Sequence, residues 1–252
     1  MNTYICIVAR LASSRLPKKA LLKIVDNLSI LEVLIKRLKN NFKNNQIILA
    51  TSNLEEDYEL INLAKSQKIK FFRGSEENVL DRIINSCKTY NDCENIVRIT
   101  GDNPLTDPYV LGKMINQHVL NKADYTYTES IPIGTRPEII SMNFLKFLSN
   151  NIEDKNNTEY LTFYLKKNLG QLKNLFEIKY EKILSNETLT VDTYEDFDYL
   201  KRIFVELNSD PLVSLKEIIN VINNKKIEKK RSKIQPKIIN QNSFRLKKNF
   251  YE

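Results

Sequence analysis

Short apolar runs alternate with amphipathic segments along the first hundred residues of the chain. Continuous apolar runs of strand length, typical of buried strands, occur at residues 4–9 and 47–50, and residues 69–72 and 95–100 are further predicted strands rich in apolar side chains. Residues 30–42 and 54–66, which lie between the first three of these strands, carry apolar side chains at helical spacing. This alternation predicts an α/β fold in which right-handed crossovers join parallel strands.

The second half of the chain has a less regular pattern. Residues 124–128 and 176–180 have the alternating or β-branched composition of strands. Helices are predicted at residues 108–121, 143–148, 158–169, 194–207 and 213–223. Two capping patterns support the helix starts, because Ser29 precedes Glu32 by three residues and Thr193 stands just before an acidic first turn.

Composition excludes several classes of protein. The 252 residues are 42% hydrophobic and 28% charged, as in an ordinary globular protein, and no apolar run approaches the roughly 20 residues of a membrane span. No basic segment precedes an apolar one at the N-terminus, so we expect no signal peptide and a cytoplasmic protein. The scattered Cys6, Cys87 and Cys93 predict neither a disulfide framework nor a metal site.

The positive charge is concentrated at the C-terminus. Residues 225–252 hold ten Lys or Arg against two acidic residues, which accounts for the whole net charge of +8. We therefore predict a single domain over residues 1–224 and a basic tail over 225–252, and we expect no nucleic-acid partner. A solvated terminus is the simpler interpretation of the tail; contact with RNA, anionic lipid or an acidic protein is the alternative.

A basic loop follows the first predicted strand. Arg10, Arg15 and Lys19 fall within ten residues, and ligands of α/β sheets bind beyond the carboxyl ends of the strands. Two guanidinium groups and an ammonium suit the oxygens of a triphosphate. A solvated basic loop with no ligand is the alternative.

Asp102 is a candidate metal ligand. It follows the strand at residues 95–100, after Gly101, which we expect to supply a positive φ. A carboxylate at the end of a strand suits Mg²⁺, which takes one or two carboxylates and leaves its other positions to phosphate and water. A second acid, Asp192, follows a short predicted strand and precedes the helix at residues 194–207. The alternative is that these acids form an ordinary turn and a helix cap.

Four motifs resemble those of the cytidylyltransferases that activate acidic sugars. The resemblance is closest to the spore-coat-polysaccharide type and extends to the acylneuraminate and deoxy-octulosonate enzymes. Its motifs are Ala9-Arg10-x-x-Ser13-Ser14-Arg15-Leu16-Pro17-x-Lys19, Arg73-Gly74-Ser75 with Val79-Leu80-x-Arg82, Gly101-Asp102-x-Pro104-Leu105, and Val191-Asp192-Thr193-x-Glu195-Asp196-Phe197. The chain departs from the family at Ala12 and Lys18, where glycine is usual, and at Tyr160, where histidine is usual.

The resemblance implies a fold and a set of roles. The fold is a Rossmann-like, three-layer α/β/α nucleotide-diphospho-sugar transferase (GT-A-like) fold with a mixed, mainly parallel sheet. The implied catalytic residues are Arg10, Arg15, Lys19 and Asp102, and the implied Mg²⁺ ligands are Asp102 and Asp192. The implied nucleotide-binding residues are Ala9, Arg10, Ser14, Lys19, Gly74, Ser75, Arg82 and Thr100. The implied acceptor-binding residues are Tyr127, Arg136, Glu138 and Tyr160.

The activity implied is transfer of CMP from CTP to an acidic sugar or a phosphorylated acceptor, with release of pyrophosphate, for surface polysaccharide synthesis. A homodimer is expected because relatives are often dimeric. One alternative is a glycosyltransferase that uses a nucleotide sugar, although its usual Asp-x-Asp pair occurs here within a predicted helix, at Asp196 and Asp198. The other is a non-catalytic nucleotide-binding protein. The single histidine, His118, is expected to be structural.

Overall fold

The computed structural model describes residues 2–88, 90, 92–152, 158, 175–177, 179, 187–225 and 227. The predicted basic tail therefore lies outside the described residues, apart from 225 and 227. The predicted helix over residues 158–169 lies outside them as well, apart from Thr158.

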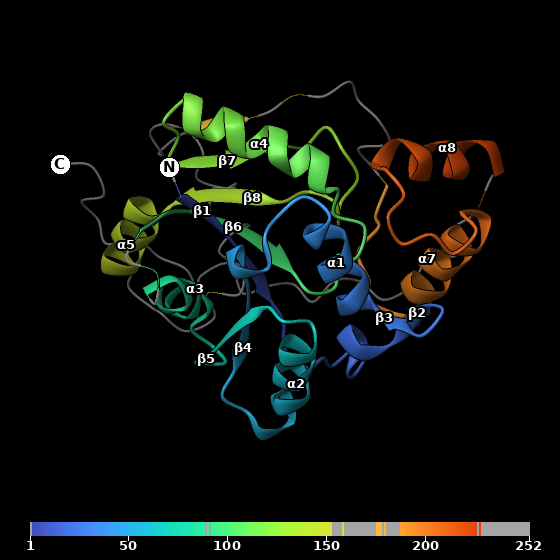
Figure 1. Ribbon diagram of the computed structural model, residues 1–252, viewed down its shortest axis with the longest axis horizontal. Coiled ribbons are helices and arrows are strands. Elements are labelled where there is room, and N and C mark those ends of the chain that lie inside the picture. Colours follow the sequence, from blue (N-terminus) through green and yellow to red (C-terminus); the bar gives the residue numbers. More distant parts are fainter. Residues whose placement is uncertain are drawn as a thin grey trace.

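A seven-stranded sheet forms the centre of the protein, in the order β5-β4-β1-β6-β8-β7-β9 (Figure 1). Strand β8 is antiparallel to both of its neighbours, and the other neighbouring pairs are parallel. The strands are β1 (Asn2–Val8), β4 (Ile47–Ser52), β5 (Lys70–Gly74), β6 (Cys93–Thr100), β7 (Tyr125–Tyr127), β8 (Glu138–Ser141) and β9 (Leu175–Glu177). This confirms the predicted mixed, mainly parallel sheet.

Helices cover both faces of the sheet (Figure 1). Alternate residues of β1 face opposite layers, because successive side chains of a strand point to opposite faces. Ile5 and Ile7 pack in the apolar layer of α1 (Ile30–Lys39), α2 (Tyr58–Ser66) and α4 (Pro108–Leu120). Cys6 and Val8 pack in the layer of α3 (Val79–Lys88) and α5 (Met142–Asn151).

A smaller unit lies beside the sheet. The hairpin of β2 (Lys23–Val25) and β3 (Leu28–Ser29) packs with α7 (Tyr194–Glu206) and α8 (Leu215–Lys225) around a separate apolar cluster. Two buried charged residues join this unit to the rest. Arg37 donates to the carbonyls of Pro211 and Val213, and Asp107 accepts from the amide of Leu215.

Several predicted boundaries were inaccurate. The first helix ends at Lys39, and Asn40 caps it, rather than continuing to residue 42. The predicted helix over residues 54–66 begins instead as the 3₁₀ helix η3 (Glu55–Asp57) before α2. Two further short 3₁₀ helices are η1 (Lys19–Leu21) and η2 (Asn44–Gln46). The strand predicted just before Asp192 was wrong, since that segment makes only a single bridge, between Ile133 and Thr188.

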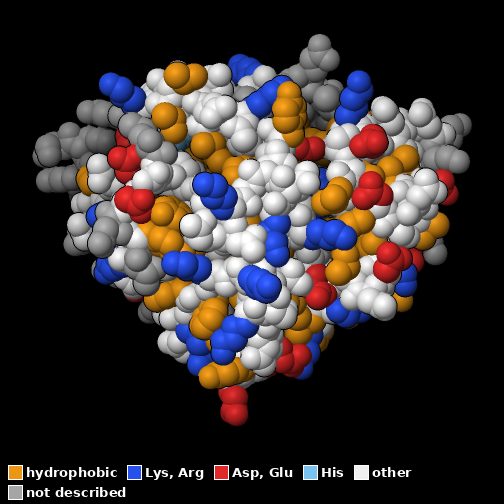
Figure 2. All heavy atoms as spheres, in the orientation of Figure 1, with side chains coloured by type: hydrophobic (Ala, Val, Ile, Leu, Met, Phe, Trp, Pro, Cys, Tyr) orange, Lys and Arg blue, Asp and Glu red, His pale blue; other side chains and the backbone are white. Residues whose placement is uncertain are grey.

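Both predicted helix caps were confirmed. Ser29 forms the predicted capping box, and the predicted N-cap Thr193 forms one with Asp196. The three cysteines are free thiols. Among the described residues, no helix is long and apolar enough to cross a membrane. On the face shown in Figure 2, Lys and Arg side chains are dispersed among acidic and hydrophobic ones.

Candidate functional site

The order of the strands positions the site. From β1 the chain first builds outward through β4 to β5, and then crosses to the other side of β1 to form β6. Loops that leave neighbouring strands at such a reversal form a crevice at the carboxyl edge of the sheet. Val8 is paired with Thr100, and the Gly101 amide donates to the Val8 carbonyl at 2.9 Å. The basic loop and the first acidic turn therefore leave the sheet side by side.

Gly101 is needed for space rather than for a positive φ. A Cβ atom at this position would lie 2.7 Å from the Cβ of Ala9, a separation that real side chains do not reach. The predicted positive φ was wrong, because Gly134 is the glycine that has one among the described residues. Ala9 and Gly101 thus bring the two loops into direct contact.

Lys19 joins the two acidic turns. Its Nζ atom donates to Asp102 Oδ2 at 2.6 Å, to Asp192 Oδ1 at 2.9 Å and to the Val191 carbonyl at 2.8 Å. Arg15 donates to the same oxygen of Asp192 at 2.7 Å. Four of the predicted site residues therefore meet at one place, with two carboxylates facing two cations. We call Arg15, Lys19, Asp102 and Asp192 the charge cluster.

Local hydrogen bonds fix the Asp102 carboxylate and the backbone on either side of Asp192. Asp102 Oδ1 accepts from the hydroxyl of Thr100 at 2.6 Å, and the Asp102 carbonyl accepts from the amide of Val191 at 3.0 Å. The next residue after Asp192, Thr193, caps α7 and forms a capping box with Asp196. The turn after β6 and the segment before α7 are thus joined by a backbone hydrogen bond as well as by Lys19.

The electrostatic balance at Lys19 keeps it charged. Burial opposes the positive charge, but the carboxylates of Asp102 and Asp192 outweigh burial, so the pKa of Lys19 is raised above its usual value. Lys19 is therefore an ammonium throughout the physiological range, with both carboxylates as its counter-ions.

An aspartate that the sequence analysis missed anchors the basic loop. Asp57 is fully buried and accepts from the amide of Leu11 at 2.7 Å and from the amide and hydroxyl of Ser52. The Leu11 carbonyl in turn accepts from the amides of Ser13 and Lys18, which closes the loop. Asp57 was placed in a predicted helix over residues 54–66 and was given no role. An acid shortly after an apolar run was the available signal.

Lys18 keeps the backbone conformation that its usual glycine would adopt. Its φ is +53°, in the left-handed region that favours glycine, and its side chain pairs with Glu59. Ala12, the other departure from the family pattern, is half-buried and has no positive φ. The loop therefore retains its shape without either glycine.

The predicted nucleoside-binding segment lies next to Arg10. Arg10 donates to Glu76 at 2.9 Å rather than to the carboxylates of the charge cluster. Buried Arg82 donates to the Ser75 carbonyl at 3.1 Å. A Cβ on Gly74 would lie 2.9 Å from the Phe72 ring and 3.1 Å from Arg82 Cγ, so glycine allows this close packing.

The remaining predicted nucleotide-binding residues lie near the charge cluster. Thr100 hydrogen-bonds Asp102, and Ala9 packs on Gly101. Ser14 is exposed in the basic loop.

The predicted acceptor residues are partly embedded in the sheet. Glu138 is buried in β8, where it accepts from Arg98 at 2.9 Å and from the Tyr125 hydroxyl. Tyr127 stacks on Tyr125 with ring centroids 5.4 Å apart. Arg136 is half-buried in the loop before β8 and donates to the Ile131 carbonyl at 2.6 Å. Tyr160 lies outside the described residues.

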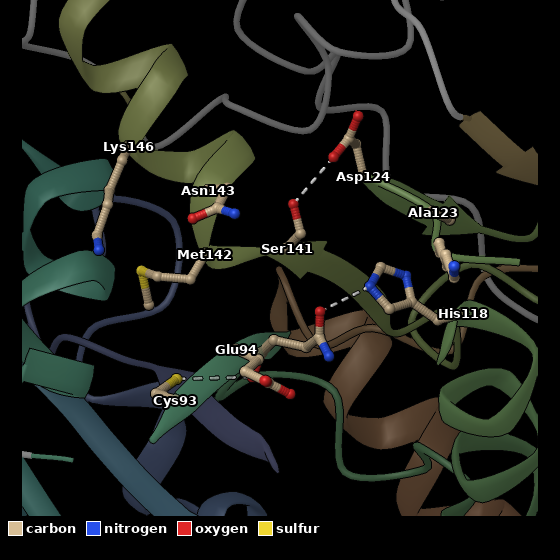
Figure 3. Close-up of a pocket in the computed structure, with 11 residues that line it drawn as sticks. Cys93, Glu94, His118, Ala123, Asp124, Ser141, Met142, Asn143 and Lys146 are labelled. Atoms are coloured by element: carbon tan, nitrogen blue, oxygen red, sulfur yellow. Dashed lines mark hydrogen bonds between the residues drawn. The ribbon is translucent and has the colours of Figure 1, made fainter. Parts of the chain in front are cut away.

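His118 belongs to a different region. A pocket of about 330 Å³ is lined by His118, Glu94, Ser141 and their neighbours (Figure 3). It lies at the start of β6, whereas Asp102 follows the end of that strand. His118 is buried, with Nδ1 2.8 Å from the Thr126 hydroxyl and Nε2 3.1 Å from Asn95 Oδ1. Burial lowers the pKa of His118 to about 4. These contacts fit the structural role expected for it.

Comparisons with known proteins identify the family of the chain. The family model described as Cytidylyltransferase matches residues 4–234. The chain is 32% identical over 231 residues to the spore coat polysaccharide biosynthesis protein SpsF of Bacillus subtilis, covering 88% of this chain and 95% of that protein.

Solved structures show the same fold. A cytidylyltransferase from Leptospira borgpetersenii superposes with a TM-score of 0.85 at 28% identity, covering 93% of this chain and all of that one. A CMP:2-keto-3-deoxy-manno-octonic acid synthetase complexed with CTP gives a TM-score of 0.63 at 13% identity, covering 82% of this chain and all of that one. The Rossmann-like nucleotidyltransferase fold implied by the sequence motifs is therefore confirmed.

Proposed function

Because the chain belongs to the cytidylyltransferase family, whose members are CTP-using nucleotidyltransferases, we propose that it transfers CMP from CTP to a small acidic acceptor and releases pyrophosphate. One observation carries the proposal. Asp102 and Asp192, ninety residues apart in the chain, lie within 3 Å of the same Lys19 nitrogen, beside Arg15. Nucleotidyl transfer needs this combination of carboxylates and cations, since positioning and charge neutralisation dominate its catalysis.

The two carboxylates fit a divalent metal ion. They converge on one cation, and all their oxygens are hard donors of the kind that Mg²⁺ prefers. Among the described residues no third His, Cys, Asp or Glu joins them, which leaves the remaining ligand positions to phosphate and water. A Mg²⁺ ion held by Asp102 and Asp192 would supply Lewis-acid stabilisation of the α-phosphate.

The cations would bind the leaving group. Arg15 and Lys19 lie beside the carboxylates, where they can donate to the β- and γ-phosphates and offset the charge that develops as pyrophosphate leaves. Arg10 is proposed for the same role, which requires it to leave Glu76. We assign catalysis to Arg10, Arg15, Lys19 and Asp102.

The nucleoside is assigned to the segment between β5 and α3. Gly74 ends β5, which pairs with β4, Ser75 follows it, and the buried Arg82 donates to the Ser75 carbonyl. Backbone groups kept in place in this way can recognise a base by its edges. Ala9, Ser14 and Thr100 complete the proposed nucleotide-binding set.

The acceptor is proposed to be an acidic sugar, which gives a CMP-sugar for surface polysaccharide synthesis. The similarity to the spore coat polysaccharide protein supports this class. Arg136 suits a carboxylate, and Tyr127, Glu138 and Tyr160 are the other proposed contacts. A phosphorylated acceptor, which would give a CDP-linked product, is the alternative. We further propose a cytoplasmic homodimer.

The structure gives less support to the two alternative functions. The Asp-x-Asp turn of a glycosyltransferase is not formed by Asp196 and Asp198, because both residues lie within α7, where Asp196 is part of the capping box with Thr193. The best support for a non-catalytic binding protein is that Ala12 and Lys18 stand where the family usually has glycine. Lys18 nevertheless adopts the left-handed backbone conformation that glycine favours.

Pyrophosphate release tests the proposal. The four ribonucleoside triphosphates are each incubated with Mg²⁺ and a panel of acidic sugars and phosphorylated polyols, and pyrophosphate is measured. The expected result is release that requires CTP, Mg²⁺ and one acceptor class. CTP binding without turnover on any acceptor would instead support a binding protein.

A further inference from the structure

Lys19 lies where the proposed metal would lie. Its ammonium is within 3 Å of one oxygen from each of Asp102 and Asp192, the carboxylates assigned to the metal. A cation between two carboxylates neutralises them, and a divalent ion arriving at the same oxygens would meet a like charge at contact distance. Lys19 and the metal therefore compete for the same ligands.

We propose that Lys19 is an exchangeable internal counter-ion that makes metal binding depend on the nucleotide. Without nucleotide, the ammonium holds Asp102 and Asp192 together and keeps divalent cations out. When a triphosphate binds, Lys19 moves to its phosphate oxygens and releases both carboxylates to the metal. This inference rests on the proposed function, because it takes the metal ligands and the triphosphate from it.

The side chain of Lys19 is suited to the exchange. Lysine carries its charge on a flexible four-carbon stem, so Nζ can move by several ångströms while the backbone stays in place. The backbone itself is held, because Lys19 begins η1 and its amide donates to the Leu16 carbonyl. The side chain is 13% exposed and that of Asp102 is 20% exposed, so the pair lies near the surface where a triphosphate can reach it.

Arg15 contributes less to this exclusion. Among the described residues its charge is paired with Asp192 alone, and its side chain is 42% exposed, so water screens its charge more than that of Lys19. Removing Arg15 leaves the Lys19 ammonium between the carboxylates. We therefore assign to Lys19 the exclusion of divalent metal from the nucleotide-free protein. A variant of Arg15 serves as the matched control.

Binding of Mn²⁺ to the nucleotide-free protein tests the proposal. The electron paramagnetic resonance signal of free Mn²⁺ is followed during titration of wild type, Lys19→Met, Lys19→Gln, Lys19→Arg and Arg15→Met. The expected result is at least tenfold tighter Mn²⁺ binding in Lys19→Met and Lys19→Gln than in wild type. Lys19→Arg keeps the positive charge, so its Mn²⁺ binding should stay as weak as that of wild type. Arg15→Met should change the affinity for Mn²⁺ less than threefold.

Two controls assign the binding to the correct site and keep the two proposals separate. Adding Asp102→Asn to Lys19→Met should abolish the gained Mn²⁺ site, and thermal denaturation confirms that each variant is folded. Unchanged or weaker Mn²⁺ binding in both uncharged Lys19 variants would overturn the counter-ion role, even if wild type releases pyrophosphate from CTP. Failure of the proposed function would appear separately, as no pyrophosphate release with any acceptor.

Discussion

The Nζ atom of Lys19 lies 2.6 Å from Oδ2 of Asp102, although 83 residues separate them in the chain. The contact exists because β1 and β6 are neighbours at the point where the strand order reverses. A basic loop after one strand and an acidic turn after the other are thereby combined into one charge cluster, which the second carboxylate, Asp192, reaches from the start of α7.

Removing the charge of Asp102 should abolish most of the activity. Asp102→Asn keeps the size of the side chain but loses a proposed metal ligand and a counter-ion of Lys19, so we expect kcat to fall by roughly a hundredfold or more. Steady-state pyrophosphate release measures the effect. Asp198→Asn is the matched control, since Asp198 is exposed on α7 and pairs only with Arg202 among the contacts described; its kcat should equal that of wild type.

Replacing Lys18 with glycine should stabilise the protein. A side chain at a φ of +53° costs about 1 kcal/mol, whereas the exposed pair with Glu59 contributes less than that. We expect the Tm of Lys18→Gly to rise by about 2 °C. Lys18→Ala keeps the strained Cβ and loses the pair, so its Tm should not rise. Equal Tm changes in the two variants would contradict this explanation.

Weakening the anchor of the basic loop should impair CTP binding. Asp57→Asn places an amide NH₂ where the backbone amides of Leu11 or Ser52 donate, which costs about 1–3 kcal/mol. We expect both a lower Tm and a raised KM for CTP. Asp107→Asn disrupts a comparable buried cap on α4 and α8, so it should lower Tm and leave that KM unchanged. A raised KM in both variants would show a general loss of structure instead.

His118 should make stability depend on acid pH. Its pKa is about 4 in the folded protein and about 6.5 when unfolded, so between these values the unfolded chain binds the extra proton. The free energy of unfolding should fall by about 3 kcal/mol as the pH drops from 6.5 to 4. Urea denaturation across this range measures it. The His118→Gln variant should lack this loss of unfolding free energy between pH 6.5 and 4. The same pH dependence in variant and wild type would contradict the assignment of this effect to His118.

Much of the fold could be predicted because local patterns matched the final structure. The apolar runs became β1, β4, β5 and β6, and the capping boxes at Ser29 and Thr193 set helix starts within one residue. The segment before Asp192 could not be predicted in the same way. Its apolar residues Leu189 and Val191 are buried in the apolar cluster of β2, β3, α7 and α8 rather than paired in a sheet. The spacing of apolar residues does not distinguish a buried loop from a buried strand.

The site was predictable in its residue types and less so in its contacts. The proximity of Lys19 and Asp102 follows from the pairing of β1 with β6, an order that the alternation of strands and helices did not specify. The convergence of Asp102 and Asp192 was implied by the family resemblance rather than by the pattern. The buried partners could not be anticipated: Asp57 beneath the basic loop, and Arg98 and Tyr125 on Glu138. These contacts join elements distant in the chain, and no local pattern records them.

Radiolabelled CTP tests the central claim most directly. The protein is incubated with Mg²⁺, an acidic sugar panel and CTP labelled on either the α- or the γ-phosphorus, and the products are separated. Transfer of CMP predicts that α-label enters an acceptor product while γ-label appears in pyrophosphate. Entry of γ-label into the acceptor, or no transfer of either label by protein that binds CTP, would contradict the account.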